Sequence, residues 1–252
     1  MNPGYSEVKV SLYNPVSPSA GLGIFSEELE GEDLSFLDGL HFHALCEQGA
    51  ETLASVLSAF EKDFASYIKK MKWVNFGGGH HITRPGYNLE YLINIINSFK
   101  KRYGVQVHLE PGEAIAMNAG ILVSSVLDIL PKTSRRRKEI AFLDTSAEDH
   151  MPDVLAMPYR PELLQRNGPG HSSNTYIFRG QTCLAGDIIG EYALSEKLKP
   201  GDRVVFLDMA IYTMVKTTTF NGVNLPSIYL LRKSGLLEEV KGFGYKDYKG
   251  RL

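Results

Sequence analysis

Cysteine, long apolar segments and net charge are all scarce in this sequence, and each shortage narrows the class of protein. The 252 residues include only Cys46 and Cys183, too few for a disulfide framework, which favours a reducing compartment. The most apolar stretch, residues 120–130, is interrupted by polar residues and is shorter than the roughly 18 residues of a membrane helix. No basic region followed by an apolar one begins the chain. We therefore expect a cytoplasmic protein with no membrane partner.

The charge balance is close to neutral. There are 27 lysines and arginines against 29 aspartates and glutamates, so no general attraction to the phosphates of nucleic acids is expected. Hydrophobic residues make up 43% of the chain and charged residues 22%, as in ordinary folded proteins. The length allows one large domain or two smaller ones.

The first half of the chain alternates between strand and helix. Residues 39–43 and 73–76 predict short strands, and the second strand runs directly into three glycines. Asn88 is a typical N-cap for a helix and Gly104 a typical helix end, and residues 105–109 predict a third strand. A helix between the first two strands carries an apolar stripe at helical spacing: Leu53, Val56, Leu57, Phe60, Phe64 and Ile68. This β-α-β-α-β order predicts a parallel sheet.

Residues that could bind a ligand or take part in catalysis stand at the end of each of the three predicted strands. His43 ends the first strand, the run Gly77, Gly78 and Gly79 follows the second, and Glu110 follows the third. In α/β barrels and open α/β sheets, the C-terminal ends of the strands carry the active site. We therefore expect these residues to lie together at one face.

After Glu113 the pattern changes to strands separated by turn signals. Turn signals include Asn167-Gly168-Pro169-Gly170 and Asn221-Gly222, and no long amphipathic helix is evident. The predicted strands cover residues 116–128, 139–144, 175–178, 203–207, 212–220 and 227–231. We expect a first domain over residues 1–115 and a mainly antiparallel second domain over residues 116–252.

The glycines and Glu110 each have a functional and an ordinary explanation. Three glycines let a backbone approach a ligand and aim amide groups at a phosphate, but they also suit a tight turn. Glu110 lies in Leu109-Glu110-Pro111-Gly112, where the chain turns just after the acid. A carboxylate there can keep a pyridine nitrogen protonated, which makes the ring an electron sink. A salt bridge at the rim is the alternative.

The histidines also leave alternatives open. His43 can stack on an aromatic cofactor or be an ordinary buried histidine. Alternation places His41 and His43 on the same side of their strand, so a metal pair is a further alternative, with His80 and His81 nearby. The chain has no HExxH or CxxC motif, and its histidine spacing matches no structural zinc pattern. No metal site is therefore predicted.

Cys183 lies in the segment Gln181-Thr182-Cys183-Leu184-Ala185-Gly186-Asp187, a polar loop that follows a predicted strand. A lone cysteine is usually inert packing, whereas an exposed loop favours an accessible, functional thiol. Both interpretations stay open from the residues alone.

Taken in order, these motifs resemble the fold-type III pyridoxal-phosphate decarboxylases, and among them the carboxynorspermidine and carboxyspermidine decarboxylases. The Gly-Gly-Gly-His-His and His-Met-Pro-Asp pieces distinguish this family from the ornithine and diaminopimelate decarboxylases. The matching segments extend along the chain and include Leu40-His41-Phe42-His43, Asn75-Phe76-Gly77-Gly78-Gly79-His80-His81, Glu110-Pro111-Gly112-Glu113-Ala114, His150-Met151-Pro152-Asp153-Val154-Leu155, Cys183-Leu184-Ala185-Gly186-Asp187 and Phe220-Asn221-Gly222.

The resemblance implies the C-terminal part of a TIM-like (β/α) barrel followed by a β-domain, in a homodimer with active sites at the subunit interface. It implies pyridoxal 5'-phosphate as the cofactor, with His43 stacking on the ring and Glu110 pairing with the ring nitrogen. The phosphate would be held by four residues: Gly77, Gly78, Gly79 and Tyr212.

The resemblance also implies roles toward a substrate. Glu113 and Asp153 would bind the amines of a polyamine precursor, since buried ammonium groups need charge-assisted partners. Cys183 would return a proton to the decarboxylated product in the neighbouring subunit's site. The implied reaction is the decarboxylation of carboxynorspermidine or carboxyspermidine to norspermidine or spermidine.

The lysine that binds the cofactor covalently in this family lies in an early barrel strand that has no counterpart in this sequence. The lysines at positions 69, 70, 72, 100 and 101 are typical of solvated helix ends. The resemblance therefore covers the C-terminal two-thirds of a family member. Two hypotheses follow: a decarboxylase represented by an N-terminally truncated chain, or a non-catalytic protein that keeps a polyamine- or phosphate-binding pocket.

Overall fold

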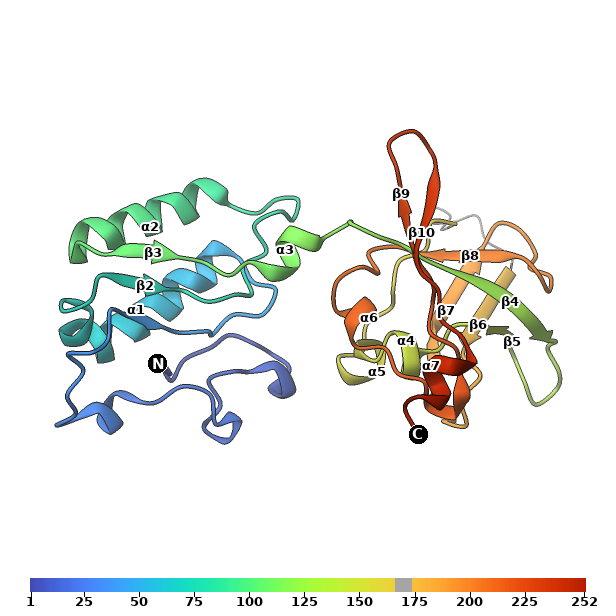
Figure 1. The fold of residues 1–252 in the computed structure, drawn as a ribbon, viewed down its shortest axis with the longest axis horizontal. Helices are drawn as coiled ribbons and strands as arrows, with labels where there is room; N and C mark the ends of the chain where they lie inside the picture. The colour runs from blue at the N-terminus through green and yellow to red at the C-terminus, as the bar shows by residue number, and fades with distance from the viewer. Residues whose placement is uncertain (166–173) are drawn as a thin grey trace. The chain divides into compact units, whose positions relative to one another are not determined.

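Figure 1 shows the fold in a computed structural model that describes residues 1–165 and 174–252. The chain divides into two units, Met1–Ala116 and Met117–Leu252, each with its own hydrophobic core. The turn predicted at Asn167-Gly168-Pro169-Gly170 lies outside the described residues.

A three-stranded parallel sheet organises the first unit. Its strands are β1 (Gly39–His41), β2 (Trp73–Asn75) and β3 (Gln106–His108), in the order β1-β2-β3. The strands are shorter than predicted, but backbone hydrogen bonds continue past their ends. The amide of Glu110, for example, donates to the carbonyl oxygen of Gly77 at 2.8 Å. The ends of β2 and β3 are therefore held together where the site residues lie.

Two long helices, α1 (Ala50–Ile68) and α2 (Leu89–Tyr103), complete this β-α-β-α-β unit. Asn88 caps α2 by accepting a hydrogen bond from the amide of Tyr91, and Gly104 ends it in the left-handed conformation with φ 71°. The predicted apolar stripe of α1 is buried, and its Phe60 contacts Phe42 after β1 with ring centroids 4.6 Å apart. The predicted helices and parallel sheet are therefore present.

The remaining parts of the first unit are irregular. Residues 1–38 contain three 3-10 turns, Ser11–Tyr13, Pro18–Ala20 and Ser26–Leu29. The short helix α3 (Gly112–Ala116) ends the unit. The strand predicted to begin at residue 116 is wrong at its start, because Pro111 and Gly112 begin a helical turn and the strand forms only from residue 122.

A five-stranded sheet organises the second unit, in the order β7-β6-β5-β4-β8. Three of its four pairings are antiparallel, and β5 with β6 is parallel, so the mainly antiparallel prediction is confirmed. Its core includes Tyr176, Phe178 and Phe206. The strands are β4 (Leu122–Leu130), β5 (Glu139–Leu143), β6 (Asn174–Arg179), β7 (Ile188–Leu194) and β8 (Arg203–Phe206).

Short elements surround this sheet. A separate hairpin pairs β9 (Ile228–Leu231) with β10 (Leu237–Lys241). Neither β7 nor β10 is among the strands that the sequence predicts. The strand predicted for residues 212–220 is wrong. Its first residues form a helical turn, and the rest have no strand partner among the described residues. The helices are α4 (Ala147–His150), α5 (Asp153–Ala156), α6 (Tyr212–Val215) and α7 (Tyr245–Lys249). No helix in the described part of the chain is long and apolar enough to cross a membrane.

Candidate functional site

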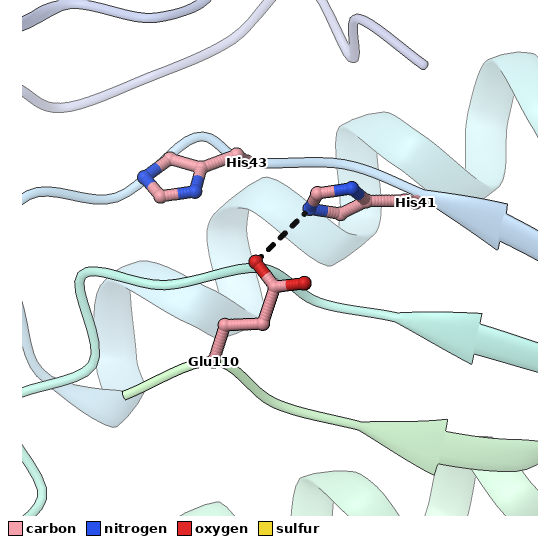
Figure 2. Close-up of side chains that lie close together, drawn as sticks. All are labelled: His41, His43 and Glu110. Carbon is pink, nitrogen blue, oxygen red and sulfur yellow. Dashed lines mark ion pairs between the residues drawn. The ribbon is translucent and has the colours of Figure 1, made fainter. Parts of the chain in front are cut away.

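The two faces of the parallel sheet differ in chemistry. Leu40 and Phe42 are buried toward the helices, whereas His41 and His43 are exposed on the opposite side, as alternation along an extended segment requires. Asn75 in β2 is hydrogen-bonded to the exposed Glu110 after β3. Figure 2 shows His41, His43 and Glu110 gathered at one edge of the sheet. The sequence prediction that these strand ends meet at one face is confirmed for these residues.

Glu110 has two partners in this group. Its Oε1 accepts a 2.7 Å hydrogen bond from Nδ2 of Asn75, and its Oε2 lies 3.6 Å from Nε2 of His41. About half of the carboxylate side chain is exposed, at 50%. The carboxylate is thus oriented by two neighbours while remaining accessible to a ligand.

Asn75 also connects Glu110 to the glycine run. Its side-chain Oδ1 accepts a 2.9 Å hydrogen bond from the amide of Gly77 while its Nδ2 donates to Glu110. One side chain therefore fixes both the start of the glycine run and the carboxylate.

His43 is tied to the same run. Its Nδ1 accepts a 3.2 Å hydrogen bond from the amide of Gly78, so this nitrogen carries a lone pair. Partial burial, followed by the like charge of His41, lowers the pKa of His43 below its usual value. A neutral imidazole is therefore favoured, which suits stacking on an aromatic ring.

The glycine run is required by close backbone contacts. A Cβ atom on Gly78 would lie 2.7 Å from the carbonyl oxygen of Glu110, and one on Gly79 would lie 2.2 Å from that of Leu45. The amides of Gly77 and Gly78 already donate within the protein, to Asn75 and His43. Their predicted role in holding a phosphate therefore requires that these two bonds be exchanged, and it stays a prediction.

Glu113 lies in α3, just after this edge. Its Oε1 is 3.2 Å from Nε2 of His81, whose side chain is only 10% exposed. His80 is also buried, and its Nε2 lies 3.3 Å from the carbonyl oxygen of Phe76. Burial lowers the pKa of His80. His80 and His81 are therefore buried within the first unit and do not belong to the exposed group that contains His41 and His43.

In the second unit, Asp153 begins α5 and binds an ammonium group of the chain itself. Nζ of Lys216 lies 2.7 Å from Oδ1 and 2.8 Å from Oδ2 of Asp153. The same Nζ lies 4.7 Å from the ring centroid of Tyr212, which is 55% exposed. Two of the predicted site residues, Asp153 and Tyr212, are therefore linked through one lysine.

Cys183 lies at the exposed tip of the loop between β6 and β7. Its amide donates a 2.8 Å hydrogen bond to Oδ1 of Asn221, a residue in the left-handed conformation with φ 54°. The accessible thiol that the sequence suggested is present, and the Asn221-Gly222 turn holds its backbone.

The buried carboxylate of Asp187 holds the Cys183 loop through hydrogen bonds. Asp187 is fully buried and accepts hydrogen bonds from the hydroxyl of Ser146, the amide of Ala147, and both the amide and hydroxyl of Thr182. The bonds from Ala147 and Thr182 Oγ1 measure 2.8 Å and 2.9 Å. Asp187 therefore joins the start of α4 to the residue that precedes Cys183.

A second acid, Asp149, holds the segment that contains Asn221. Oδ1 of Asp149 accepts from the hydroxyl of Thr218 and, at 2.9 Å, from the amide of Phe220, which precedes Asn221. Burial raises the pKa of Asp149, and the hydrogen bond from Thr218 partly opposes that change. The hydrogen bond between Cys183 and Asn221 is therefore supported on both sides: Asp187 binds the residue before Cys183, and Asp149 binds the residue before Asn221.

The lysines expected at helix ends lie where predicted. Those at positions 69, 70, 72, 100 and 101 are all exposed, near the ends of α1 and α2, and Lys72 pairs with Asp38. None of the residues of β1, β2 or β3 is a lysine.

Residues 10–210 match the family described as pyridoxal-dependent decarboxylase, C-terminal sheet domain. The chain belongs to the pyridoxal-dependent decarboxylases. Within this family, a carboxynorspermidine/carboxyspermidine decarboxylase of Campylobacter jejuni is 48% identical, over 99% of this chain and 67% of that protein. A carboxyaminopropylagmatine decarboxylase of Synechocystis is 43% identical, over 100% of this chain and 65% of that protein. The chain thus spans about two thirds of the length of these decarboxylases.

Solved decarboxylase structures have the same fold. The crystal structure of carboxynorspermidine decarboxylase from Campylobacter jejuni, complexed with norspermidine, superimposes with a TM-score of 0.85 at 47% identity, covering 96% of this chain and 67% of that one. A diaminopimelate decarboxylase structure gives a TM-score of 0.80 at 19% identity over 100% of this chain and 65% of that chain, which shows the fold alone. The family resemblance and the fold class derived from the sequence are confirmed.

The residues of the first unit fit the ring of the family's cofactor. Glu110 offers an accessible, oriented carboxylate to a pyridine nitrogen, and His43 offers a neutral imidazole beside it. A carboxylate can keep a pyridine nitrogen protonated, and a neutral imidazole can pack against the ring.

Sequence reasoning does not single out two residues of these networks, Asn75 and Lys216. Asn75 lies just before the glycine run, but a lone amide side chain there gives no signal of its own. Lys216 is 63 positions from Asp153 along the chain. A position at the end of a predicted strand marks a residue as a candidate for the site. These residues instead act through contacts with segments that are distant in the sequence, so the local sequence does not reveal them.

Proposed function

We propose that this chain serves in the pyridoxal-phosphate-dependent decarboxylation of a carboxylated polyamine, carboxynorspermidine or carboxyspermidine. The observation that carries the proposal is the placement of Glu110 beside His43, at the edge of the sheet where β1, β2 and β3 end. Two relatives that match nearly the whole chain are named carboxynorspermidine/carboxyspermidine decarboxylase and carboxyaminopropylagmatine decarboxylase. Norspermidine or spermidine is the expected product.

In this proposal, the first unit holds the cofactor ring. Glu110, oriented by Asn75, keeps a proton on the ring nitrogen, and His43 packs against the ring face. When bound, such a ring is an electron sink for the bond that loses carbon dioxide. Gly77, Gly78, Gly79 and Tyr212 are the proposed phosphate ligands.

Asp153 and Glu113 are the proposed partners of substrate amines. Asp153 already receives the Lys216 ammonium on both carboxylate oxygens, at 2.7 Å and 2.8 Å, so its geometry suits an alkylammonium group. A substrate amine would take the place of Lys216. Cys183, with its thiol exposed, is the proposed donor of the proton that replaces the carboxylate, acting in the site of a neighbouring subunit.

A homodimer with active sites at the subunit interface is part of the proposal. Exposed apolar side chains on the β9–β10 hairpin support a surface that a second chain covers, with Leu231 at 68% and Leu237 at 60% exposure. Sedimentation of the purified chain measures this directly. The cytoplasmic location expected from the sequence stays a prediction.

The test is cofactor binding followed by turnover. We expect the purified chain to change the absorbance of added pyridoxal phosphate, and we expect Glu110→Gln to weaken that change. Glu90→Gln, on the exposed surface of α2, is the control and should bind as wild type does. Absence of any cofactor binding would refute the proposed function.

Turnover distinguishes the second candidate function, a non-catalytic protein that keeps the pocket. Release of carbon dioxide from carboxynorspermidine would support the decarboxylase. Binding of cofactor or norspermidine with no carbon dioxide release would support the binding protein.

A further inference from the structure

His41 has no part in the proposed catalytic function, yet it lies in a compact group with His43 and Glu110. One ligand atom from each of the three lies within 4.8 Å of the others, and all three residues are exposed. Nε2 of His41 is 3.6 Å from Oε2 of Glu110. Two ligands on a tetrahedral zinc ion, with bonds of about 2.1 Å, lie about 3.4 Å apart. This pair already has nearly that spacing.

The third ligand requires only a local adjustment. A ligand atom of His43 already lies within 4.8 Å of one on each of the other two residues, so only a small further approach completes the set. Its Nδ1 carries a lone pair and accepts a 3.2 Å hydrogen bond from Gly78. Coordination through that nitrogen exchanges a single neutral hydrogen bond for a metal bond.

The neighbours of Glu110 orient it for this role. Asn75 holds Oε1 at 2.7 Å, which leaves Oε2 directed at His41. Such a partner behind a ligating carboxylate fixes its orientation and is a regular feature of metal sites. Elsewhere in residues 1–165 and 174–252, no other group of three histidine, cysteine or acidic side chains reaches this spacing.

The ligand types select the ion. Two imidazoles and one carboxylate suit zinc and similar divalent transition metals, whereas magnesium and calcium prefer oxygen ligands alone. Three protein ligands at an exposed site leave the fourth position to water. We propose that His41, His43 and Glu110 bind one divalent transition-metal ion of the zinc class in the cofactor-free chain.

This site shares two of its three ligands with the proposed cofactor site. His43 and Glu110 cannot coordinate a metal ion and contact a pyridine ring at the same time. Metal and cofactor binding are therefore mutually exclusive, while His41 belongs to the metal site only. The metal site itself does not depend on the proposed function.

The experiment is calorimetric titration of zinc chloride into the full chain without cofactor. We expect one ion per chain, and we expect His41→Gln and Glu110→Gln each to weaken binding at least about tenfold, the loss typical even of an outer partner of a metal site. His108→Gln is the matched control, because His108 is an exposed histidine of β3 outside the group. It should bind zinc as wild type does. Circular dichroism confirms that each variant is folded.

Two results would overturn the proposal. One is the absence of zinc binding; the other is binding that persists unchanged in His41→Gln and Glu110→Gln, which would place the ion elsewhere. Competition gives an independent readout: zinc should reduce cofactor uptake in wild type more than in His41→Gln. If no cofactor binds at all, the proposed function fails while the calorimetric result still decides the metal site.

Discussion

The side-chain amide of Asn75 donates a 2.7 Å hydrogen bond to the carboxylate of Glu110, joining the end of β2 to the end of β3. Because Asn75 also accepts from the amide of Gly77, Asn75→Ala removes two bonds at once. We expect it to lower the free energy of unfolding of the first unit by about 1 to 2 kcal/mol. Trp73 is the single tryptophan, so its fluorescence during urea denaturation reports on this unit. Asn94→Ala, on the exposed face of α2, should change stability by less than about 0.5 kcal/mol. Equal losses in the two variants would contradict the bridging role.

A comparison of Gly79 with Gly86 distinguishes backbone strain from steric overlap as the cost of adding a side chain. Both have a left-handed backbone, with φ of 79° and 82°, so alanine strains both by about 1 to 2 kcal/mol. Around Gly86 no atom lies within 4 Å of the added Cβ, whereas at Gly79 the carbonyl oxygen of Leu45 lies at 2.2 Å. We expect Gly79→Ala to cost about 3 kcal/mol or more, and Gly86→Ala only the backbone strain. Trp73 fluorescence in urea measures both, and similar losses would show that the contact with Leu45 relaxes easily.

Asp187 should be essential to the loop that carries Cys183. Asp187→Asn places an amide donor among the N–H and O–H donors of Ser146, Ala147 and Thr182, so at least one donor loses its acceptor. We expect a loss of about 2 to 3 kcal/mol in the second unit. Hydrogen exchange of the Thr182 amide should speed up in parallel. Asp128→Asn, at an exposed position of β4, is the control and should leave both measurements unchanged.

His150 should make the second unit sensitive to acid. The neutral ring is fully satisfied: Nδ1 accepts from the amide of Ser146, and Nε2 donates to the carbonyl oxygen of Asn224 at 3.0 Å. Burial lowers the pKa of His150 below 6.5, so the unfolded chain binds a proton more readily than the folded one. This contribution to stability is present above about pH 6.5 and is lost as the pH falls through the pKa of the folded state.

The loss is measured by following unfolding of the second unit between neutral and mildly acidic pH. It is expected to reach at most about 1.4 kcal/mol per pH unit for one site. His150→Gln, whose amide keeps one acceptor and one donor, should flatten the dependence, and the exposed control His108→Gln should preserve it. A steep acid dependence in His150→Gln would assign the effect to other groups.

The sequence by itself determined the parallel sheet, its two helices and the family. Apolar spacing in residues 53–68 requires a buried helical face, Asn88 and Gly104 set the ends of the next helix, and polar residues after each strand mark one edge. These features depend on neighbours a few positions apart, which local chemistry specifies. The short helices and turns of the second unit are harder to predict from the sequence. Residues 212–220 are rich in β-branched and aromatic side chains, yet they fold as a helical turn and a segment held by Asp149.

Only the tertiary structure decided how the site residues are paired. Asn75 reaches Glu110, Lys216 reaches Asp153, and Asp187 reaches Ser146 across separations of 35 to 63 positions. The alternation of strand and helix predicts that His43 and Glu110 meet at one face, but the grouping of His41 with these two residues, without His80 or His81, is seen only in the folded chain. Hydrogen bonds and ion pairs of this kind depend on positions fixed by the packing of distant segments, and that packing is a property of the folded chain.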